Sequence, residues 1–238
     1  MLILLLLGLA LPGSVVYGNS AAKLAVVQLE SRYRTAGVLQ ATFLERYLEN
    51  GQAVRTEAGI AYFRRPGKMR WEYASPEKNL FLVDGKTAWF YVPADHTVTR
   101  VPAKQSADWR TPIALLAGEM KLSRICSRVD IAEGKQPEHQ DDVLLFCTLR
   151  GEKNPVEQGS TRESRSTEHE EGVLLEIARD TGDLVDVLVQ DKGGVSIEFK
   201  FANWQFDSPV PDSLFRFDVP RGVAIVNGEA RPGSESSR

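Results

Sequence analysis

Apolar and polar residues alternate with a period of two in the best-patterned stretch of the chain, residues 63–93. Three large side chains fall on one face of an extended segment: Met69, Trp71 and Tyr73. Charged residues stand between them, which is the pattern of a strand in a sheet with one apolar side. Turn-forming clusters then delimit two shorter strands, 79–83 and 87–92. This stretch therefore predicts an antiparallel meander with large rings on its buried face.

The same period predicts further strands on both sides of this meander. A strand that begins at Val38 places Ala41 and Phe43 on one face, and the turn at Asn50–Gly51 connects it to a partner at 55–63. The strands expected after the meander are 96–101, 122–131, 142–149, 173–179, 184–190, 194–202 and, closing the sheet, 216–226. The pattern predicts a mainly β protein.

Helical spacing occurs in only a few segments. In Ala21–Tyr33, apolar residues recur at helical intervals before Gly37 ends the pattern, so we expect a helix that packs on the sheet. Residues 209–215 are typical of a short connecting helix or a turn.

A further short helix, of one or two turns, is expected within 108–118, DWRTPIALLAG. Pro112 suits the first helical position, and Gly118 can supply a left-handed stop. Three apolar residues occupy most of its circumference: Ile113, Leu115 and Leu116. One buried stripe would require less apolar surface than this.

The residues of the meander also carry a family resemblance. The order RRP, a Trp followed by a polar residue and an aromatic, a Pro turn and then DGKTAWFYVP resembles the LolA-type periplasmic outer-membrane lipoprotein carriers. The later TPIALLAG and LFRFDVPRGVAIV resemble the lid helix and last strand of that family, so the resemblance covers most of 24–226. It implies a strongly curved, unclosed antiparallel sheet, a half-barrel, with a helical lid over a cavity for the acyl chains of lipoproteins.

The resemblance also implies roles for individual residues. The cavity lining would comprise Phe43, Phe63, Met69, Trp71, Tyr73, Trp89 and Tyr91. The lid would carry Ile113, Leu115 and Leu116. At Met69 the family has an aromatic residue, so the behaviour of that aromatic does not carry over. Periodicity alone leaves a plain packed core as the alternative, because a core and an apolar cavity use the same residue types.

Arg65 is the expected latch of the lid, since the second Arg of the family motif holds the lid shut. If the strand continues without a bulge, Arg65 faces the same way as Phe63. A guanidinium that faces an apolar interior requires hydrogen-bond partners, and carbonyl groups near the lid are the expected acceptors. The alternative is a surface residue on a strand.

Length, composition and charge narrow the class of protein. The chain has 238 residues, 42% of them hydrophobic, and a formal net charge of −3. We expect one domain at 19–226 with a single core, a polar loop or insertion at 151–171, a disordered tail at 227–238 and a monomeric state. The scattered Lys and Arg residues give no basic field, which argues against nucleic acid as a partner.

The first 18 residues, MLILLLLGLALPGSVVYG, indicate a signal peptide, although no Lys or Arg precedes the apolar run. No lipobox Cys follows it, so the expected product is a soluble protein of the periplasm.

In that oxidising compartment Cys126 and Cys147 are predicted to form a disulfide, with two buried free thiols as the alternative. Neither cysteine fits a zinc site, so we expect no metal and no cofactor.

No motif in the sequence indicates an enzyme. GxSxG, HExxH, the P-loop and the dinucleotide fingerprint are all missing, and Asp95-His96 is more typical of a turn than of a catalytic dyad. We therefore expect no catalytic residue.

The leading hypothesis is a carrier that accepts acylated lipoproteins from an inner-membrane lipoprotein-release transporter and delivers them to an outer-membrane lipoprotein acceptor. Two alternatives remain open. One is an RseB-like lipid or lipoprotein sensor, and the other is a structural cell-envelope protein without a ligand.

Overall fold

The computed structural model describes residues 15–103, 114–118, 121–150, 171–191 and 193–228. Within these ranges the chain forms one strongly curved 13-stranded sheet in the order β1-β8-β9-β10-β11-β12-β2-β3-β4-β5-β6-β7-β13. The sheet does not close on itself, because β1 and β13 are its two free edges. The predicted mainly β, unclosed fold is confirmed.

The first half of the chain supplies β1 (Val16–Tyr17), β2 (Val38–Glu49), β3 (Gln52–Arg64), β4 (Lys68–Ser75), β5 (Leu80–Val83), β6 (Thr87–Val92) and β7 (Thr97–Pro102). The second half supplies β8 (Cys126–Ile131), β9 (Val143–Leu149), β10 (Gly172–Ile177), β11 (Leu184–Gln190), β12 (Val195–Phe206) and β13 (Ala224–Asn227). The helical elements are α1 (Ser20–Arg34), α2 (Ala114–Ala117) and the 3₁₀ turns η2 (Leu122–Arg124) and η4 (Asp212–Phe215).

Two antiparallel meanders join at the middle of the sheet. β2 to β7 follow one another on one side, β8 to β12 on the other, and β12 pairs with β2 from Val195↔Glu49 to Phe206↔Leu39. Among the strands that the structure describes, only the edge strands pair in parallel, β1 with β8 and β13 with β7. The core therefore combines side chains from both ends of the sequence.

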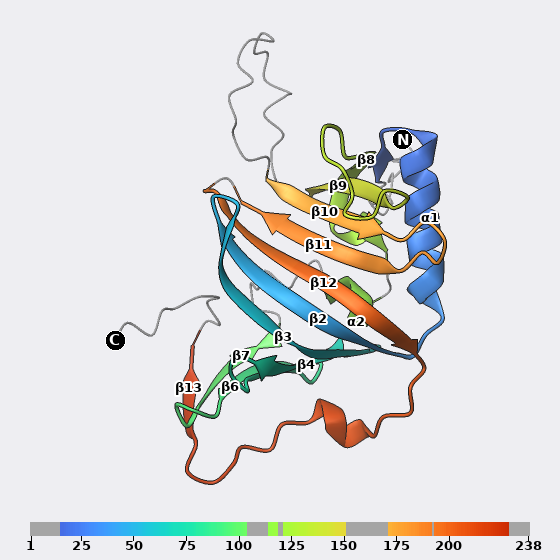
Figure 1. Ribbon diagram of the computed structural model, residues 1–238. Helices are drawn as coiled ribbons and strands as arrows, with labels where there is room; N and C mark the ends of the chain where they lie inside the picture. Colours follow the sequence, from blue (N-terminus) through green and yellow to red (C-terminus); the bar gives the residue numbers. More distant parts are fainter. Residues whose placement is uncertain (1–14, 104–113, 119–120, 151–170, 192, 229–238) are drawn as a thin grey trace, which may run out of the picture.

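Helix α1 covers the concave side near β8 (Figure 1). The side chain of Asn19 caps the helix by accepting a hydrogen bond from the amide of Ala22 at 2.8 Å. Tyr33 is fully buried, and its hydroxyl accepts a hydrogen bond from the Leu184 amide at 2.8 Å. Burial raises the pKa of this phenol. The predicted helix 21–33 is thus confirmed.

The segment that follows β12 runs across the convex face and binds it by directional contacts. Arg64 pairs with Asp212 and donates to the carbonyl of Val210 at 2.7 Å. Arg70 donates to the carbonyl of Leu214 at 3.1 Å, and Phe215 is buried. The convex face of β4 to β7 is therefore covered by the chain itself.

Some predicted boundaries are wrong. The expected strand 122–131 begins with the 3₁₀ turn η2, so its strand part is only Cys126–Ile131. In the expected closing strand 216–226, only the end joins the sheet, as part of Ala224–Asn227. Phe217 instead packs on the rings of Trp89 and Tyr91.

A disulfide joins Cys126 and Cys147, with 5.5 Å between their Cα atoms. It links the neighbouring strands β8 and β9, as the sequence predicted.

Parts of other predicted segments lie outside the described residues: 1–14 of the signal peptide, 151–170 of the loop and 229–238 of the tail. Residues 16 and 17, also within the predicted signal peptide, form strand β1. None of the described helices is sufficiently long and apolar to cross a membrane.

A candidate ligand site on the concave face

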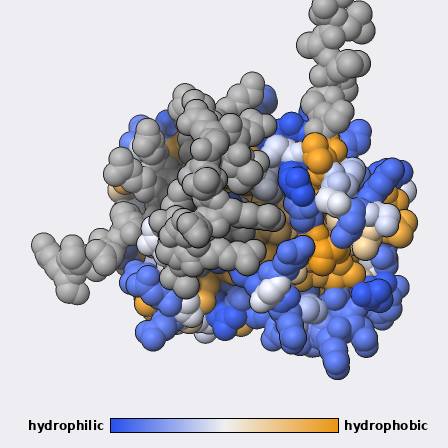
Figure 2. Space-filling model, turned by 90° about the horizontal axis from the view of Figure 1, so that it is seen from above, coloured by the Kyte–Doolittle hydropathy of each residue, from blue (hydrophilic) through white to orange (hydrophobic). Residues whose placement is uncertain are grey.

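Aromatic rings from four strands meet on the concave face of the sheet. Trp71 on β4 is fully buried, and its ring centroid lies 4.8 Å from that of Phe43, 5.6 Å from Phe63 and 5.3 Å from Phe199. Phe201 adds a further ring at 6.1 Å. These rings are themselves buried, and Figure 2, a view from above, shows on the surface a group of hydrophobic residues among hydrophilic ones. Trp71 is therefore the centre of an aromatic cluster built by both halves of the chain.

The register of the strands explains this convergence. Side chains that are paired across neighbouring strands share a face, and Ala61 pairs with Trp71, which pairs with Phe81. On the other side of β3, Ala61 pairs with Ala41. These small alanines leave room for the indole between the flanking rings.

Five of the predicted lining residues lie on this concave face. Phe43, Phe63, Met69, Trp71 and Tyr73 are all buried, none exposing more than 8% of its surface. In this structure the aromatic face is thus covered rather than open to solvent.

Trp89 and Tyr91 do not share that face. Ala88 and Phe90 pair with the inward residues Val83 and Phe81, so Trp89 and Tyr91 point to the convex side. Their rings lie 5.4 and 5.5 Å from Phe217. Their prediction as lining residues is wrong, because alternation within a strand gives two faces but does not say which of them is the concave one.

Arg65 follows β3 directly and reaches the last turn of α1. Its guanidinium donates to the carbonyl of Tyr33 at 2.6 Å and to that of Arg34 at 2.5 Å. Carbonyl groups at a helix C-terminus have no partner within the helix and attract a cation. Burial lowers the pKa of Arg65, and Asp207 opposes this shift. Among the described contacts, the hydrogen bonds of the Arg65 guanidinium are with α1 rather than with α2.

Helix α2, in the segment predicted to form a lid, is attached through the backbone two residues further on. The amide of Gly67 donates to the carbonyl of Ala117, the last residue of α2, at 2.8 Å. Gly67 has a φ of +66°, a conformation that glycine adopts without strain. Residues 65–67 therefore bind the C-terminal carbonyl groups of both α1 and α2.

The predicted lid residues are described only in part. Leu116 is buried in the same apolar cluster as Trp71, and α2 contacts β3 and β4. Ile113 and the side chain of Leu115 lie outside the described residues.

One end of the concave face is polar, an arrangement that the sequence analysis above does not predict. Tyr73 donates its hydroxyl hydrogen to Glu45 at 2.7 Å, and both side chains are buried. Glu57 lies opposite Glu45 in the register and accepts a hydrogen bond from Arg55 at 2.5 Å. Every second residue of β2 points inward. Glu45 continues the series Leu39, Ala41 and Phe43, so this alternation indicates that Glu45 also points inward.

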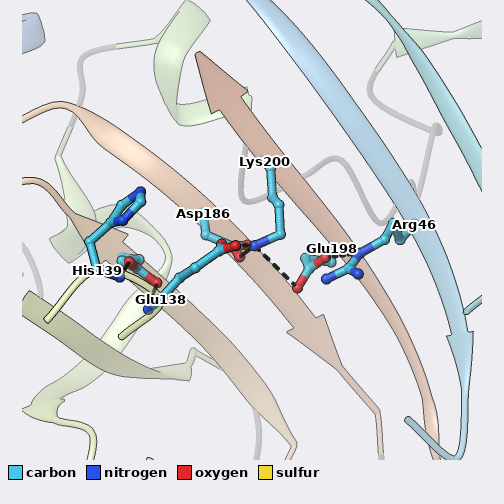
Figure 3. Close-up of polar contacts among 7 residues, drawn as sticks. Arg46, Glu138, His139, Asp186, Glu198 and Lys200 are labelled. Carbon is cyan, nitrogen blue, oxygen red and sulfur yellow. Dashed lines mark hydrogen bonds and ion pairs between the residues drawn. The ribbon is translucent and has the colours of Figure 1, made fainter. Parts of the chain in front are cut away.

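A second polar cluster lies on the convex face of β10 to β12 and β2 (Figure 3), and its members Glu176 and Glu198 are buried. Lys200 contacts Asp186 at 3.0 Å and Glu198 at 4.0 Å and pairs with Glu138, and Arg46 pairs with Glu198. Burial, followed by the charge of Glu198, raises the pKa of Asp186 to about 7. The cluster borders a hollow of about 550 Å³.

Glu176, in the same cluster, fixes the loop between β8 and β9. Its carboxylate accepts hydrogen bonds from the amides of Glu138 at 3.0 Å and His139 at 3.2 Å. In the described part of the chain, no group of three or more His, Cys, Asp or Glu side chains is placed to hold a metal ion. We interpret this cluster as a structural clamp.

An unclosed antiparallel sheet with aromatic rings under short helices defines the half-barrel class of folds. Comparison with solved structures agrees at the level of fold: the chain resembles the crystal structure of an uncharacterized conserved protein from Thermus thermophilus, with a TM-score of 0.52, 12% identity and coverage of 88% of this chain and 100% of that one.

The family follows from sequence relatives. Residues 34–145 match the model of the outer membrane lipoprotein carrier protein LolA. The chain is 30% identical over 203 residues to an outer-membrane lipoprotein carrier protein of Nitrosospira multiformis, covering 84% of this chain and 86% of that protein. It is also 30% identical to one of Chromobacterium violaceum, with 86% and 88% covered. The chain belongs to the LolA family of outer-membrane lipoprotein carrier proteins.

Proposed function

We propose that this protein is a periplasmic carrier that binds the acyl chains of lipoproteins against its concave aromatic face. The observation that carries the proposal is the aromatic cluster around Trp71, which four strands build and against which Leu116 of the four-residue helix α2 packs. A short helix attached by few contacts can move without disrupting the sheet. The membership of the chain in the LolA family supports the same proposed function.

The closed face limits how the carrier binds its cargo. Because the lining residues expose at most 8% of their surface, acyl chains enter only when the lid helix moves and the rings repack. Each buried CH₂ contributes about 0.8 kcal/mol, so two enclosed chains of roughly 16 carbons would exceed the practical ceiling of about 20 kcal/mol on non-covalent affinity. The free energy needed to open the concave face lowers the net affinity for the acyl chains. A carrier requires this lower affinity in order to release its cargo.

Arg65 and Gly67 are the proposed latch. Arg65 holds the end of α1 and Gly67 the end of α2, so this one turn connects both helices to the sheet. Closing restores these hydrogen bonds and expels the acyl chains. The partners in this cycle are an inner-membrane release transporter, which loads the open form, and an outer-membrane acceptor, which receives the cargo.

Arg65→Leu tests the latch. The variant loses both charge-assisted hydrogen bonds, each worth about 1.5–3 kcal/mol, and gains apolar surface. It should load with lipoprotein as well as or better than the wild type, but transfer it poorly to outer-membrane vesicles that bear the acceptor. Arg64→Leu is the matched control, because Arg64 binds the convex segment at Asp212 and Val210. Equal transfer by Arg65→Leu and wild type would contradict the latch.

Two measurements separate the carrier from its rivals. Mass spectrometry of protein purified from the periplasm should find diacylated lipoprotein or lipid bound to it, whereas a structural protein without a ligand would carry none. A sensor would bind the lipoprotein but fail to transfer it to acceptor vesicles. Binding without transfer by the wild type would therefore favour the RseB-like alternative.

A further inference from the structure

The indole N–H of Trp71 lies in the middle of the aromatic cluster without a hydrogen-bond partner among the described residues. The side chain is 0% exposed, and its Nε1 atom has no acceptor within reach. The planes of the Phe43, Phe63 and Phe199 rings are inclined to the indole plane by 68°, 89° and 61°. A buried donor with no acceptor is rare in native proteins and calls for a specific reason.

The other described indoles differ in this respect. Trp204 donates to the carbonyl of Leu184 at 2.8 Å, and Trp89 donates to the carboxylate of Asp84 at 3.3 Å. Both of these rings are only partly buried, yet each has an acceptor. Among the indoles that the structure describes, the most deeply buried one is therefore the one without an acceptor.

We propose that Trp71 Nε1 is the docking point for a carbonyl oxygen of the bound lipid, so that the site selects acyl chains, linked by ester or amide bonds, over plain alkyl chains. This inference rests on the proposed carrier function and adds the chemical class of group that the site recognises. In the closed form the indole N–H has no hydrogen-bond partner among the described residues. In the loaded form the ligand supplies the acceptor.

The surroundings of Trp71 favour a carbonyl over other acceptors. An indole is a donor only, and the rings around it offer no acceptor for the hydrogen of a ligand hydroxyl. A phosphate or carboxylate would bring an unpaired charge into an apolar cluster, at a large desolvation cost. A carbonyl accepts the hydrogen bond from the indole, requires no second donor and no counter-charge, and leaves its hydrocarbon chain among the phenylalanine rings.

The test is a competition between two lipids that differ only in this group. Wild-type protein is equilibrated with vesicles that contain equal amounts of 1,2-dipalmitoylglycerol, which has ester carbonyls, and 1,2-di-O-hexadecylglycerol, which has ether oxygens. Protein is then isolated, and both bound lipids are quantified by mass spectrometry. We expect a bound ratio of about ten to one in favour of the ester, as one satisfied buried donor predicts.

Trp71→Phe should reduce that ratio to about one, because phenylalanine keeps the ring and removes the donor. Trp89→Phe is the matched control, since it makes the same change on the convex face, and it should keep the wild-type ratio. A ratio near one in the wild type, or a preference that survives in Trp71→Phe, would overturn the inference. If the wild type takes up neither lipid, the carrier function itself fails, which is a distinguishable result.

Infrared spectroscopy provides a second readout that does not depend on the folding of a variant. The ester carbonyls of the dipalmitoylglycerol are labelled with ¹³C, and their stretching band is recorded in wild-type protein. A component shifted to lower frequency than in a hydrocarbon solvent is expected from the indole hydrogen bond. A band at the hydrocarbon position would overturn the inference, even if Trp71→Phe does not fold.

Discussion

The aromatic cluster on the concave face and the polar cluster on the convex face bury their side chains by different physical means. On the concave face, Trp71 and Phe199 are fully buried against other rings. On the convex face, Glu176 and Glu198 are 4% and 9% exposed, and they accept hydrogen bonds from backbone amides and an arginine. Apolar contacts are non-directional, whereas hydrogen bonds fix distance and angle. The concave face can therefore repack around different chains, while the convex face holds one loop in one position.

The largest effect should come from emptying the concave face. Trp71→Ala removes the central ring and leaves a cavity among four others, so unfolding by denaturant should require about 3–5 kcal/mol less free energy. Trp89→Ala, on the convex face, should cost only about 1 kcal/mol, since that ring is half-buried. Similar losses of unfolding free energy in Trp71→Ala and Trp89→Ala would contradict the larger contribution of the concave aromatic cluster to stability.

A smaller effect is expected from the clamp on the convex face. Glu176→Ala leaves the amides of Glu138 and His139 without their acceptor, which should cost about 2 kcal/mol. Hydrogen exchange should accelerate at these two amides while those of β2 and β3 stay protected. Glu133→Ala, an exposed position in the same loop, is the control. Unchanged exchange at Glu138 and His139 would contradict the clamp.

The smallest effect concerns pH and Asp186. Its pKa is raised to about 7 in the folded protein from an ordinary value of 3.8, because burial and Glu198 disfavour the carboxylate. Between these values the folded state binds a proton that the unfolded state has lost. The contribution to stability is thus complete below pH 3.8 and is lost as the pH rises through 7.

Asp186→Asn should remove this dependence. Relative to wild type, its unfolding free energy should rise with pH and exceed the wild-type value by about 1–2 kcal/mol at pH 8. Lys200 keeps Glu138 and Glu198 as partners in the variant. Asp218→Asn, at an exposed position, should show no such trend in thermal melts from pH 4 to pH 8. A constant difference between Asp186→Asn and wild type would contradict the assignment.

The sequence predicted the strands of the meander well, because the period of two is local. It did not predict the relative phase of β6, which depends on the pairing of Phe81 with Phe90 across a turn. Trp89 and Tyr91 were therefore assigned to the wrong face. Local alternation predicts which side chains share a face of the strand, but it does not predict which of the two faces is the concave one.

Long-range pairing accounts for the other omissions. The alternation in 194–202 indicated a buried face, but nothing local places Phe199 and Phe201 beside Trp71, since that requires β12 to pair with β2. Glu198 and Lys200 have the pattern of a solvent face, yet Glu198 is buried beside Lys200, which pairs with Glu138 of the β8–β9 loop. The acceptors of Arg65 belong to α1. Periodicity does not predict where this helix lies relative to Arg65.

The pairing of β12 with β2 has a consequence for how the chain folds. The two strands are about 150 residues apart in sequence, so their contacts raise the contact order and should make folding slow. Until residue 195 and those after it are available, β2 has no partner on that side and exposes an edge of twelve residues rich in aromatic and branched side chains. Such an edge is a template for pairing with another copy. A chain that is truncated or stalled before β12 should therefore aggregate through β2, and holding the nascent chain unfolded until it is complete would protect it.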